Sequence, residues 1–272
     1  MYGKVNLDDL FEITTLYTAH YNKFPTTHSF PGESHDFWEI VIVLDGQIGI
    51  TAGQNIMILN KGQAILHEPM EFHRLWSEGN SPPEVVIFSF SCLNMPPLKS
   101  RIFQINHFNR RESRSLISAV RNTFSTSDVS VTGIPDPDSL TYQIIIKKLE
   151  VFILNILSEN IADVERPSLQ SAKNYSEIIK LLENNLDKNL KISEIAKMCS
   201  MSEINLKKTF NKYAGTGIKT YFNQLKMNEA ISMLRSGLTV TETASALGFS
   251  DQNYFSASFK RIIGKPPSEF KK

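Results

Sequence analysis

The chain has 272 residues, enough for two domains, and its 41% hydrophobic and 21% charged residues are typical of a globular protein. It contains no run of about 18 uncharged apolar residues, which argues against a membrane span. Its start, Met1 to Leu10, lacks the apolar core of a signal peptide, and Cys92 and Cys199 are too few for a disulfide framework. These features predict a cytoplasmic protein with no membrane partner.

The net charge of +1 hides an asymmetry between two parts of the chain. Residues 173–272 carry 16 Lys+Arg and 9 Asp+Glu, a net of +7, whereas the remainder carries 13 and 19, a net of −6. A basic C-terminal third fits a phosphate-binding module, and an acidic remainder fits a module that avoids nucleic acid.

Residues 1–107 have the pattern of a small β domain. The β-branched run 38–44 ends at the turn Asp45-Gly46, which predicts a hairpin with a strand over 47–51. Further strands are predicted over 55–59, 63–67 and 84–90, because turn-forming residues separate these runs. Short strands at this spacing favour a barrel or a sandwich.

Residues 108–162 change to a helical period, with helices predicted over 110–124 and 140–160 and a polar loop over 125–139. The second helix has an apolar stripe at helical spacing, made by Ile145, Leu149, Phe152, Ile153, Ile156 and Leu157. Two alternatives remain open: the stripe packs on its own barrel, or it pairs with a second copy in a homodimer. The polar stretch 162–173 is the predicted linker.

Residues 173–272 contain an internal repeat. Residues 194–202 correspond to residues 242–250 at an offset of 48, and Phe210 corresponds to Phe259 at an offset of 49. Each copy has the pattern of a helix, a tight turn and a second helix, over 192–213 and 239–263, and a helix over 218–235 joins them. Two such units in tandem predict two DNA-reading helices on one rigid body.

Particular residue types support this prediction. Ala196 and Ala244 are small enough for the close helix crossing of each unit. Gly248 suits a turn that needs a positive φ, whereas Ser200 suits the same position of the first unit less well. Donors that suit base edges and phosphates stand on the outer faces of the second helices: Asn205, Lys207, Lys208 and Asn211, and Gln252, Asn253, Ser256 and Lys260.

The C-terminal third resembles the DNA-binding domain of the AraC/XylS family of bacterial transcription regulators over residues 173–271. The residues that carry the resemblance are Ile195-Ala196, Ser202, Leu206, Phe210, Tyr221, Ala230, Leu234, Ala244, Gly248-Phe249, Tyr254-Phe255, Phe259-Lys260, Gly264, Pro267 and Phe270. The resemblance implies seven helices, with two recognition helices in adjacent major-groove segments of double-stranded DNA. It also implies activation by contact with RNA polymerase.

The resemblance also assigns groove contacts by position. They fall on Ile204, Lys207 and Lys208 in the first unit, and on Asn253, Ser256 and Ala257 in the second. Ala257 departs from the basic residue that is frequent in the family, and alanine cannot donate a hydrogen bond. The second unit is therefore expected to rely more on backbone anchoring by Lys260 and Arg261.

The N-terminal part resembles the cupin-like sensor barrels of the same family. The resemblance rests on His35-Asp-Phe-Trp-Glu39 followed by Gly46, on residues 62–69 and on His73. Barrel pockets combine apolar walls with a few fixed polar groups, and aromatic rings beside charged groups suit a sugar. The residues predicted to line a ligand pocket are His35, Trp38, Glu39, His73, Arg74, Trp76 and Phe88.

An enzyme is the competing interpretation of this barrel. Metal-binding cupins are similar in having a His-x-His-x3-Glu pattern and a distant histidine, which map onto Glu33, His35, Glu39 and His73. Such mixed ligands can hold a divalent metal, so a metal-dependent cupin enzyme fused to a DNA-binding tail stays open as an alternative. The sequence favours an inherited fold signature, with no metal, no cofactor and no catalytic residue.

The predicted fold class is α+β, with a cupin-like β-barrel over 1–107, a helical dimerisation or linker region over 108–162 and an all-α DNA-binding domain over 173–272. The predicted function is that of an effector-responsive transcription regulator, an activator of a catabolic, carbohydrate operon. A DNA binder without an effector is a third class. The predicted partners are promoter DNA, RNA polymerase, a small effector and a second copy of the chain.

Overall fold

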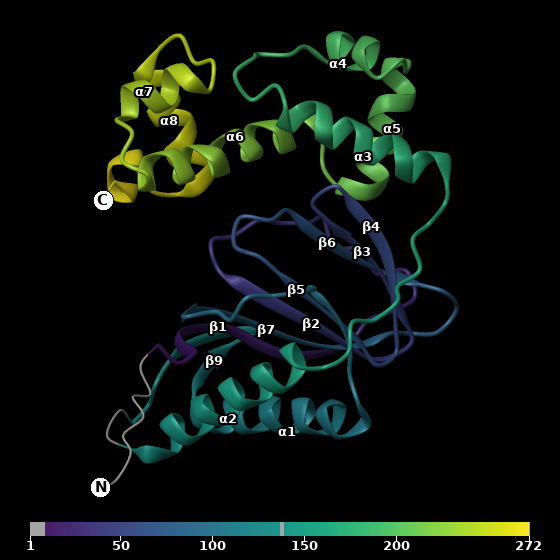
Figure 1. Cartoon of the computed structure of the whole chain (residues 1–272), viewed down its shortest axis with the longest axis vertical. Helices are drawn as coiled ribbons and strands as arrows, with labels where there is room; N and C mark the ends of the chain where they lie inside the picture. The colour runs from purple at the N-terminus through teal and green to yellow at the C-terminus, as the bar shows by residue number, and fades with distance from the viewer. Residues whose placement is uncertain (1–8, 137–138, 272) are drawn as a thin grey trace, which may run out of the picture. The chain divides into compact units, whose positions relative to one another are not determined.

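A computed structural model describes residues 9–136 and 139–271 of the chain (Figure 1). The segment in which a signal peptide was considered lies almost wholly outside the described residues. The chain divides into two units, one with Met57–Arg166 and the chain up to Ala52, the other with Pro167–Lys272 and Gly53–Ile56. Within the described residues, every helix is too short or too polar to cross a membrane.

The part of the first unit that the structure describes contains two β-sheets. The larger has the strand order β8-β5-β2-β7-β1-β10-β9, and the smaller has the order β4-β3-β6. The strands are β1 (Glu12–Lys23), β2 (Trp38–Asp45), β3 (Gln47–Ala52), β4 (Asn55–Asn60), β5 (Gln63–His67), β6 (His73–Glu78), β7 (Glu84–Leu93), β8 (Ile102–Gln104), β9 (Ser125–Ser127) and β10 (Ser130–Gly133). The five strands predicted from the sequence are all present.

The strands that the sequence did not predict are mostly polar. β1 places Thr18, His20 and Asn22 in the wall of a cavity, so it lacks the apolar alternation of a half-buried strand. The predicted polar loop over 125–139 contains β9 and β10, and Ser130 of β10 pairs with Thr18 of β1. That loop prediction is therefore wrong for residues 125–127 and 130–133.

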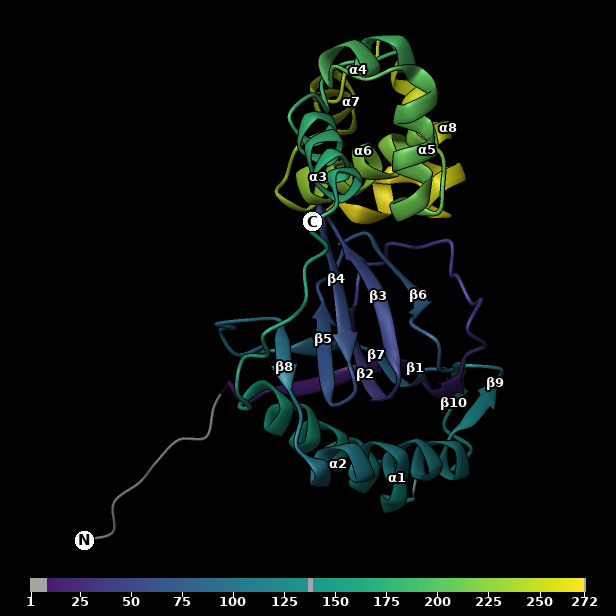
Figure 2. The same ribbon diagram turned by 90° about the vertical axis from the view of Figure 1, so that its right-hand side faces the viewer.

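The first unit has three layers, which Figure 2 shows from the side: the small sheet, the large sheet and a helix pair. The pair consists of α1 (His107–Thr123) and α2 (Leu140–Leu157). Alternate residues of β2 point to opposite faces of the large sheet. Val41 and Val43 pack between the two sheets, whereas Ile40 and Ile42 pack between the large sheet and the helix pair. This period of two decides which side chains can reach a site between the sheets.

The apolar stripe of α2 packs within its own unit. Ile145, Leu149, Phe152, Ile153 and Ile156 are at most 7% exposed and belong to the core beneath the large sheet, and Leu157 packs against it. The first alternative for this stripe is therefore correct. The helix pair shares a core with the sheets and is not a separate region of the chain.

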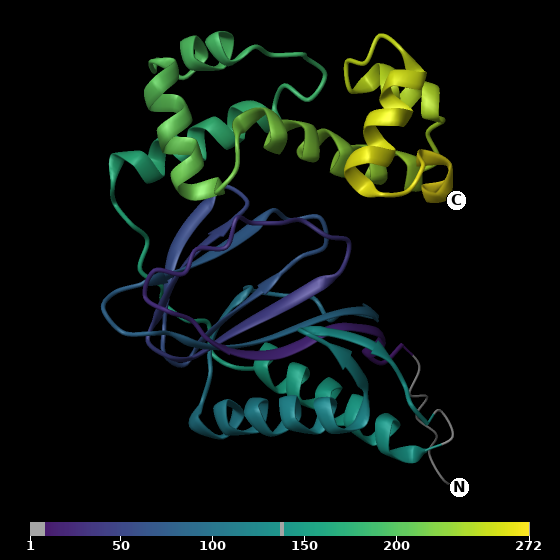
Figure 3. The same cartoon turned by 180° about the vertical axis from the view of Figure 1, so that it is seen from behind.

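The second unit is helical within the described residues. Its helices are α3 (Gln170–Glu183), α4 (Ile192–Met198), α5 (Glu203–Ala214), α6 (Ile218–Arg235), α7 (Val240–Ala246), α8 (Gln252–Ile263) and a 3-10 helix (Pro267–Phe270). Figure 3 shows α6 running between the α4–α5 pair and the α7–α8 pair. The helix α3 begins inside the predicted linker, because Ala172 is buried and the Ser171 hydroxyl lies 2.8 Å from the Tyr213 hydroxyl.

Both helix-turn-helix units have the local geometry that their sequences predict. Ser200 and Gly248 occupy the two turns with φ of 54° and 74°. The buried alanines, Ala196 and Ala244, are 3% and 2% exposed. Thr239 begins α7 with a capping box, in which the Thr239 N–H donates to Glu242 Oε2 at 2.8 Å.

A buried lysine of α6 joins parts of the second unit that are distant in sequence. The Lys226 ammonium donates to the carbonyl of Lys188, before α4, and to that of Leu247, in the turn after α7, both at 2.8 Å. It also lies 5.1 and 5.3 Å from the ring centres of Phe222 and Phe249. Burial lowers the pKa of Lys226 to about 8. The turn between α7 and α8 is thereby fixed to the long helix α6.

Gly248 offers a direct test of the turn geometry. A Cβ at this position would meet the Asp187 carbonyl, whereas a Cβ at Gly237, which also has a positive φ, would meet nothing within 4 Å. Both alanine substitutions should cost about 1 kcal/mol for the left-handed backbone. Gly248→Ala should cost about 1–3 kcal/mol more from the clash. Amide hydrogen exchange of α7 and α8 in the full chain measures the difference, and equal protection in the two variants would contradict the close packing.

Candidate functional site: a barrel cavity and two recognition helices

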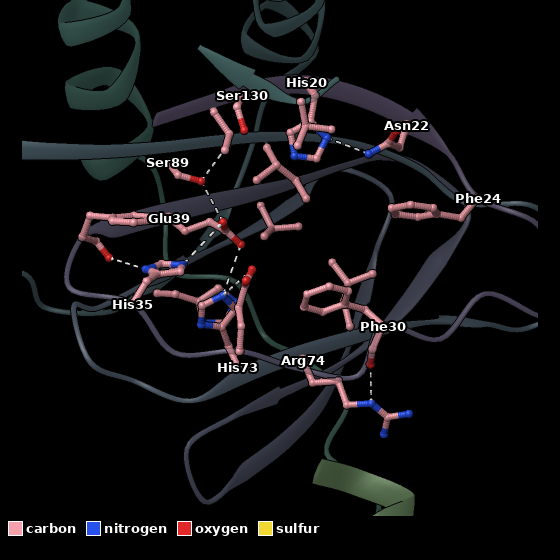
Figure 4. A pocket seen from close by; sticks show the side chains of 18 of the residues that line it. His20, Asn22, Phe24, Phe30, His35, Glu39, His73, Arg74, Ser89 and Ser130 are labelled. Carbon is pink, nitrogen blue, oxygen red and sulfur yellow. Dashed lines mark hydrogen bonds and ion pairs between the residues drawn. The ribbon is translucent and has the colours of Figure 1, made fainter. Parts of the chain in front are cut away.

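A cavity of about 420 Å³ lies between the two sheets of the first unit (Figure 4). Strands β1, β2, β5, β6, β7 and β10 and the segment that connects β1 to β2 contribute to its wall. Residues that line it include Thr18, His20, Asn22, Phe24, Phe30, Glu33, His35, Phe37, Glu39, His67, His73, Arg74, Ile87 and Ser89. The wall thus combines aromatic rings with a group of buried polar side chains.

Four of the seven predicted pocket residues line this cavity: His35, Glu39, His73 and Arg74. The other three, Trp38, Trp76 and Phe88, do not line the cavity, so the prediction is wrong for them. Trp38 and Phe88 point away from the cavity into the core beneath the helices, on the opposite face from Glu39 and Ser89. Trp76 lies across Gly49 of the neighbouring strand, where a side chain would collide with the indole.

Glu39 is the centre of the polar group. Its Oε2 lies 3.7 Å from His35 Nε2, and its Oε1 lies 3.4 Å from His73 Nε2. The Ser89 hydroxyl donates to Oε2 at 2.8 Å, and the Thr18 hydroxyl lies 2.6 Å from that of Ser89. Figure 4 shows the two imidazoles on one side of the carboxylate and Ser89 on the other.

The charge states of the group follow from these contacts. Burial opposes ionisation of Glu39, but the neighbouring imidazoles of His35 and His73 hold the pKa of this carboxyl well below its ordinary value. Burial acts to lower the pKa of His73, and the Glu39 carboxylate reverses this and raises it. Burial and the Glu39 charge both raise the pKa of Glu33. These contacts favour the ionised form of Glu39.

A second histidine network, centred on His67, supports the wall of the cavity. His67 stacks on His73 with ring centres 4.3 Å apart, and its Nδ1 lies 3.1 Å from Glu71 Oε2. Arg101 donates to the other oxygen of Glu71 at 2.8 Å. Burial lowers the pKa of His67 to about 4, so this imidazole is neutral and acts as a structural support.

Arg74 holds the segment between β1 and β2. Its Nε donates to the Phe30 carbonyl at 2.7 Å and its Nη2 to the Ser29 hydroxyl at 2.6 Å. These bonds place Phe30 in the wall of the cavity. The sequence did not single out Phe24, Phe30 and Phe37, because they belong to a segment without a clear strand or helix period.

Most predicted DNA-contacting side chains are exposed on the second helix of each unit. On α5, Ile204 is 81% exposed, and Asn205, Lys207, Lys208 and Asn211 are also exposed. On α8, Gln252, Asn253, Lys260 and Arg261 are exposed and Ser256 is half-buried. In Figure 2, α5 and α8 are both on the right of the second unit, with α3 on the left.

Each second helix is fixed by buried aromatic rings and by an N-terminal cap. Phe210 and Phe255 are fully buried, and the Ser202 and Asp251 side chains accept hydrogen bonds from the first turns of α5 and α8. Tyr254, which the sequence marked only as part of the resemblance, is 65% exposed on α8 beside Asn253. Its ring therefore adds an aromatic group to the polar side chains on the outer face of α8.

Two family comparisons cover most of the chain. Residues 16–145 match the AraC-like ligand binding domain, and residues 195–272 match a helix-turn-helix domain. These ranges contain the cavity-forming sheets and the two recognition helices, respectively.

Similar proteins extend over nearly the whole chain. The Msm operon regulatory protein of Streptococcus mutans is 26% identical, with 98% of this chain and 97% of the relative covered. The HTH-type transcriptional activator RhaS of Salmonella arizonae is 24% identical, with 89% and 88% covered. Among solved structures, ToxT from Vibrio cholerae is 14% identical with 96% of each chain covered and a TM-score of 0.37. The chain belongs to the AraC family of helix-turn-helix transcription regulators, which are not enzymes, and has an AraC-like ligand-binding domain in its N-terminal half.

Proposed function

We propose that this regulator activates transcription of a catabolic operon when a small polar effector, a sugar, occupies the barrel cavity. One observation carries the proposal: the same chain has a cavity of about 420 Å³ with a buried polar group and two exposed recognition helices. The relatives named as an operon regulatory protein and a transcriptional activator support activation. Its partners are promoter DNA and RNA polymerase, and it acts in the cytoplasm.

The lining of the cavity supports the choice of effector. Phe24 and Phe30 offer apolar ring surfaces, and Asn22 offers amide donors and acceptors. Aromatic rings beside amide, imidazole and carboxylate groups suit a neutral polyhydroxyl compound.

The proposed switch is a shift between two arrangements of a homodimer. An effector that binds one arrangement of the first unit more tightly changes the populations, and hence the spacing of two DNA-binding units. The buried stripe of α2 is already used within the chain, so the dimer must use another surface. Leu140, Ile144 and Val151 are exposed on the outer side of the same helix.

The effector proposal predicts that transcription depends on the cavity. In vitro transcription with RNA polymerase and a promoter bound by the full-length protein should rise when the right monosaccharide is added. Ile87→Phe, which puts a larger side chain into the cavity wall, should abolish this response while DNA binding persists. Trp76→Phe, outside the cavity, is the matched control and should respond normally. Transcription that is equal with and without every sugar tested would contradict the proposal and favour a constitutive regulator.

The DNA-reading proposal predicts a loss of affinity from the outer face of α5. Lys207→Ala and Lys208→Ala should each weaken binding to a duplex selected by the full-length protein, by about 1–3 kcal/mol if a base contact is lost. A lost phosphate contact should instead lower the slope of binding against salt concentration by about one. Fluorescence anisotropy at several salt concentrations distinguishes the two roles.

The matched control is Lys180→Ala, an exposed lysine on α3 outside both recognition helices. It should leave the affinity and the salt slope unchanged. Normal affinity in the Lys207→Ala/Lys208→Ala double variant would rule out this face of α5 as the reading surface.

A further inference from the structure

The two imidazoles beside Glu39 are fixed in one tautomer by the backbone. His35 Nδ1 lies 3.0 Å from the Phe37 carbonyl, and His73 Nδ1 lies 3.1 Å from the Glu71 carbonyl. A carbonyl can only accept, so each Nδ1 carries the hydrogen. In a neutral imidazole the other nitrogen, Nε2, then presents a lone pair, and both Nε2 atoms face the Glu39 carboxylate.

Two lone pairs that point at a carboxylate repel it, and either protonation of Nε2 or a metal ion between the groups would relieve this repulsion. Both Nε2 atoms are buried and, among the described residues, neither has a hydrogen-bond partner. A protonated Nε2 would form a charge-assisted hydrogen bond of about 2.7–2.9 Å to a carboxylate. The observed separations of 3.4 and 3.7 Å from Glu39 oxygens are longer than that.

The spacing is close to that of ligands around a metal ion. Nitrogen and oxygen ligands lie about 2.0–2.2 Å from a zinc ion, which puts neighbouring ligands of a tetrahedron roughly 3.3–3.6 Å apart. The 3.4 Å between His73 Nε2 and Glu39 Oε1 is within this range, whereas the 3.7 Å from His35 Nε2 to Glu39 Oε2 and the 3.9 Å from His73 Nε2 to Glu33 Oε1 exceed it, so these side chains must move closer to bind one ion. One ligand atom from each of Glu33, His35, Glu39 and His73 lies within 4.8 Å of all the others.

We infer that Glu33, His35, Glu39 and His73 bind a divalent first-row transition-metal ion in the wall of the barrel cavity. Two imidazole nitrogens and two carboxylate oxygens are the ligand types that zinc, iron and manganese accept. The sequence favoured an inherited signature without a metal, because it could not show where the four side chains or their hydrogens lie. The inference does not rest on the sugar effector proposed above, and it adds no catalytic step.

The surroundings of the four ligands are built as in metal sites. Ligating histidines usually donate their second nitrogen to a carbonyl or carboxylate, and ligating carboxylates are themselves hydrogen-bonded. Both histidines meet the first condition through Phe37 and Glu71. Glu39 meets the second through the Ser89 hydroxyl. These contacts pre-orient three of the four ligands.

Metal titration of the full-length protein tests the inference. Protein stripped with a chelator should bind one equivalent of Zn²⁺ and gain thermal stability, since a ligand of the native state stabilises it. Co²⁺ should bind at the same site with the visible absorption of a four-coordinate ion, and Zn²⁺ should displace it. His73→Ala and Glu39→Gln should each weaken binding by more than about 100-fold, and Ser89→Ala by about 10–100-fold.

His28→Ala is the matched control, because His28 lines the same cavity but stacks on Phe24 outside the cluster. It should retain the full affinity. If a ligand variant fails to fold, ¹⁵N NMR of the wild-type histidines decides instead, since Zn²⁺ should shift Nε2 of His35 and His73 and leave Nδ1 protonated. No stoichiometric uptake, or uptake that survives in the His35→Ala/His73→Ala double variant, would overturn the inference and leave protons as the cations beside Glu39.

Discussion

The DNA-binding unit depends on a lysine that is buried where two turns meet a long helix. The Lys226 ammonium satisfies the carbonyl of Lys188, before the first copy of the sequence repeat, and that of Leu247, inside the second copy. Without it, two buried carbonyl groups lose a charged donor, and such bonds contribute about 1.5–3 kcal/mol each. Because Gly248 also packs directly on the Asp187 backbone, the second turn has one position relative to the segment before α4. The helix α6 has 18 residues and is about 27 Å long, which is near the 34 Å of one duplex turn.

The C-terminal third could be predicted well because its signals are local. The repeat, the capping box at Thr239 and the glycine at 248 each specify backbone geometry within a few residues. The long helix over 218–235 is found with the predicted bounds. The helix α3 begins inside the predicted linker over 162–173, since Ala172 is buried and Ser171 contacts the distant Tyr213.

The cavity could be predicted only in part because its residues come from distant segments. His35, Glu39 and His73 were found through a motif, but Phe30 is placed by an arginine 44 residues away. The error at Trp38 was avoidable, because adjacent residues of a strand face opposite sides and Glu39 was already assigned to the cavity. The hydrogen positions on His35 and His73 depend on carbonyls that only the fold brings near. The sequence therefore identified the four candidate ligands but not the orientation of their side chains.

The central claim is that one rigid body presents α5 and α8 to neighbouring segments of the major groove. The most direct measurement is the affinity of the full-length protein for a selected duplex in which base pairs are inserted between the segments that α5 and α8 protect. Five inserted base pairs, about half a helical turn, move one segment to the opposite side of the duplex. The account therefore predicts that one helix no longer protects its segment and that the affinity falls to that for a single segment. Unchanged affinity and full protection of both segments would contradict it, because the two helices would then move independently.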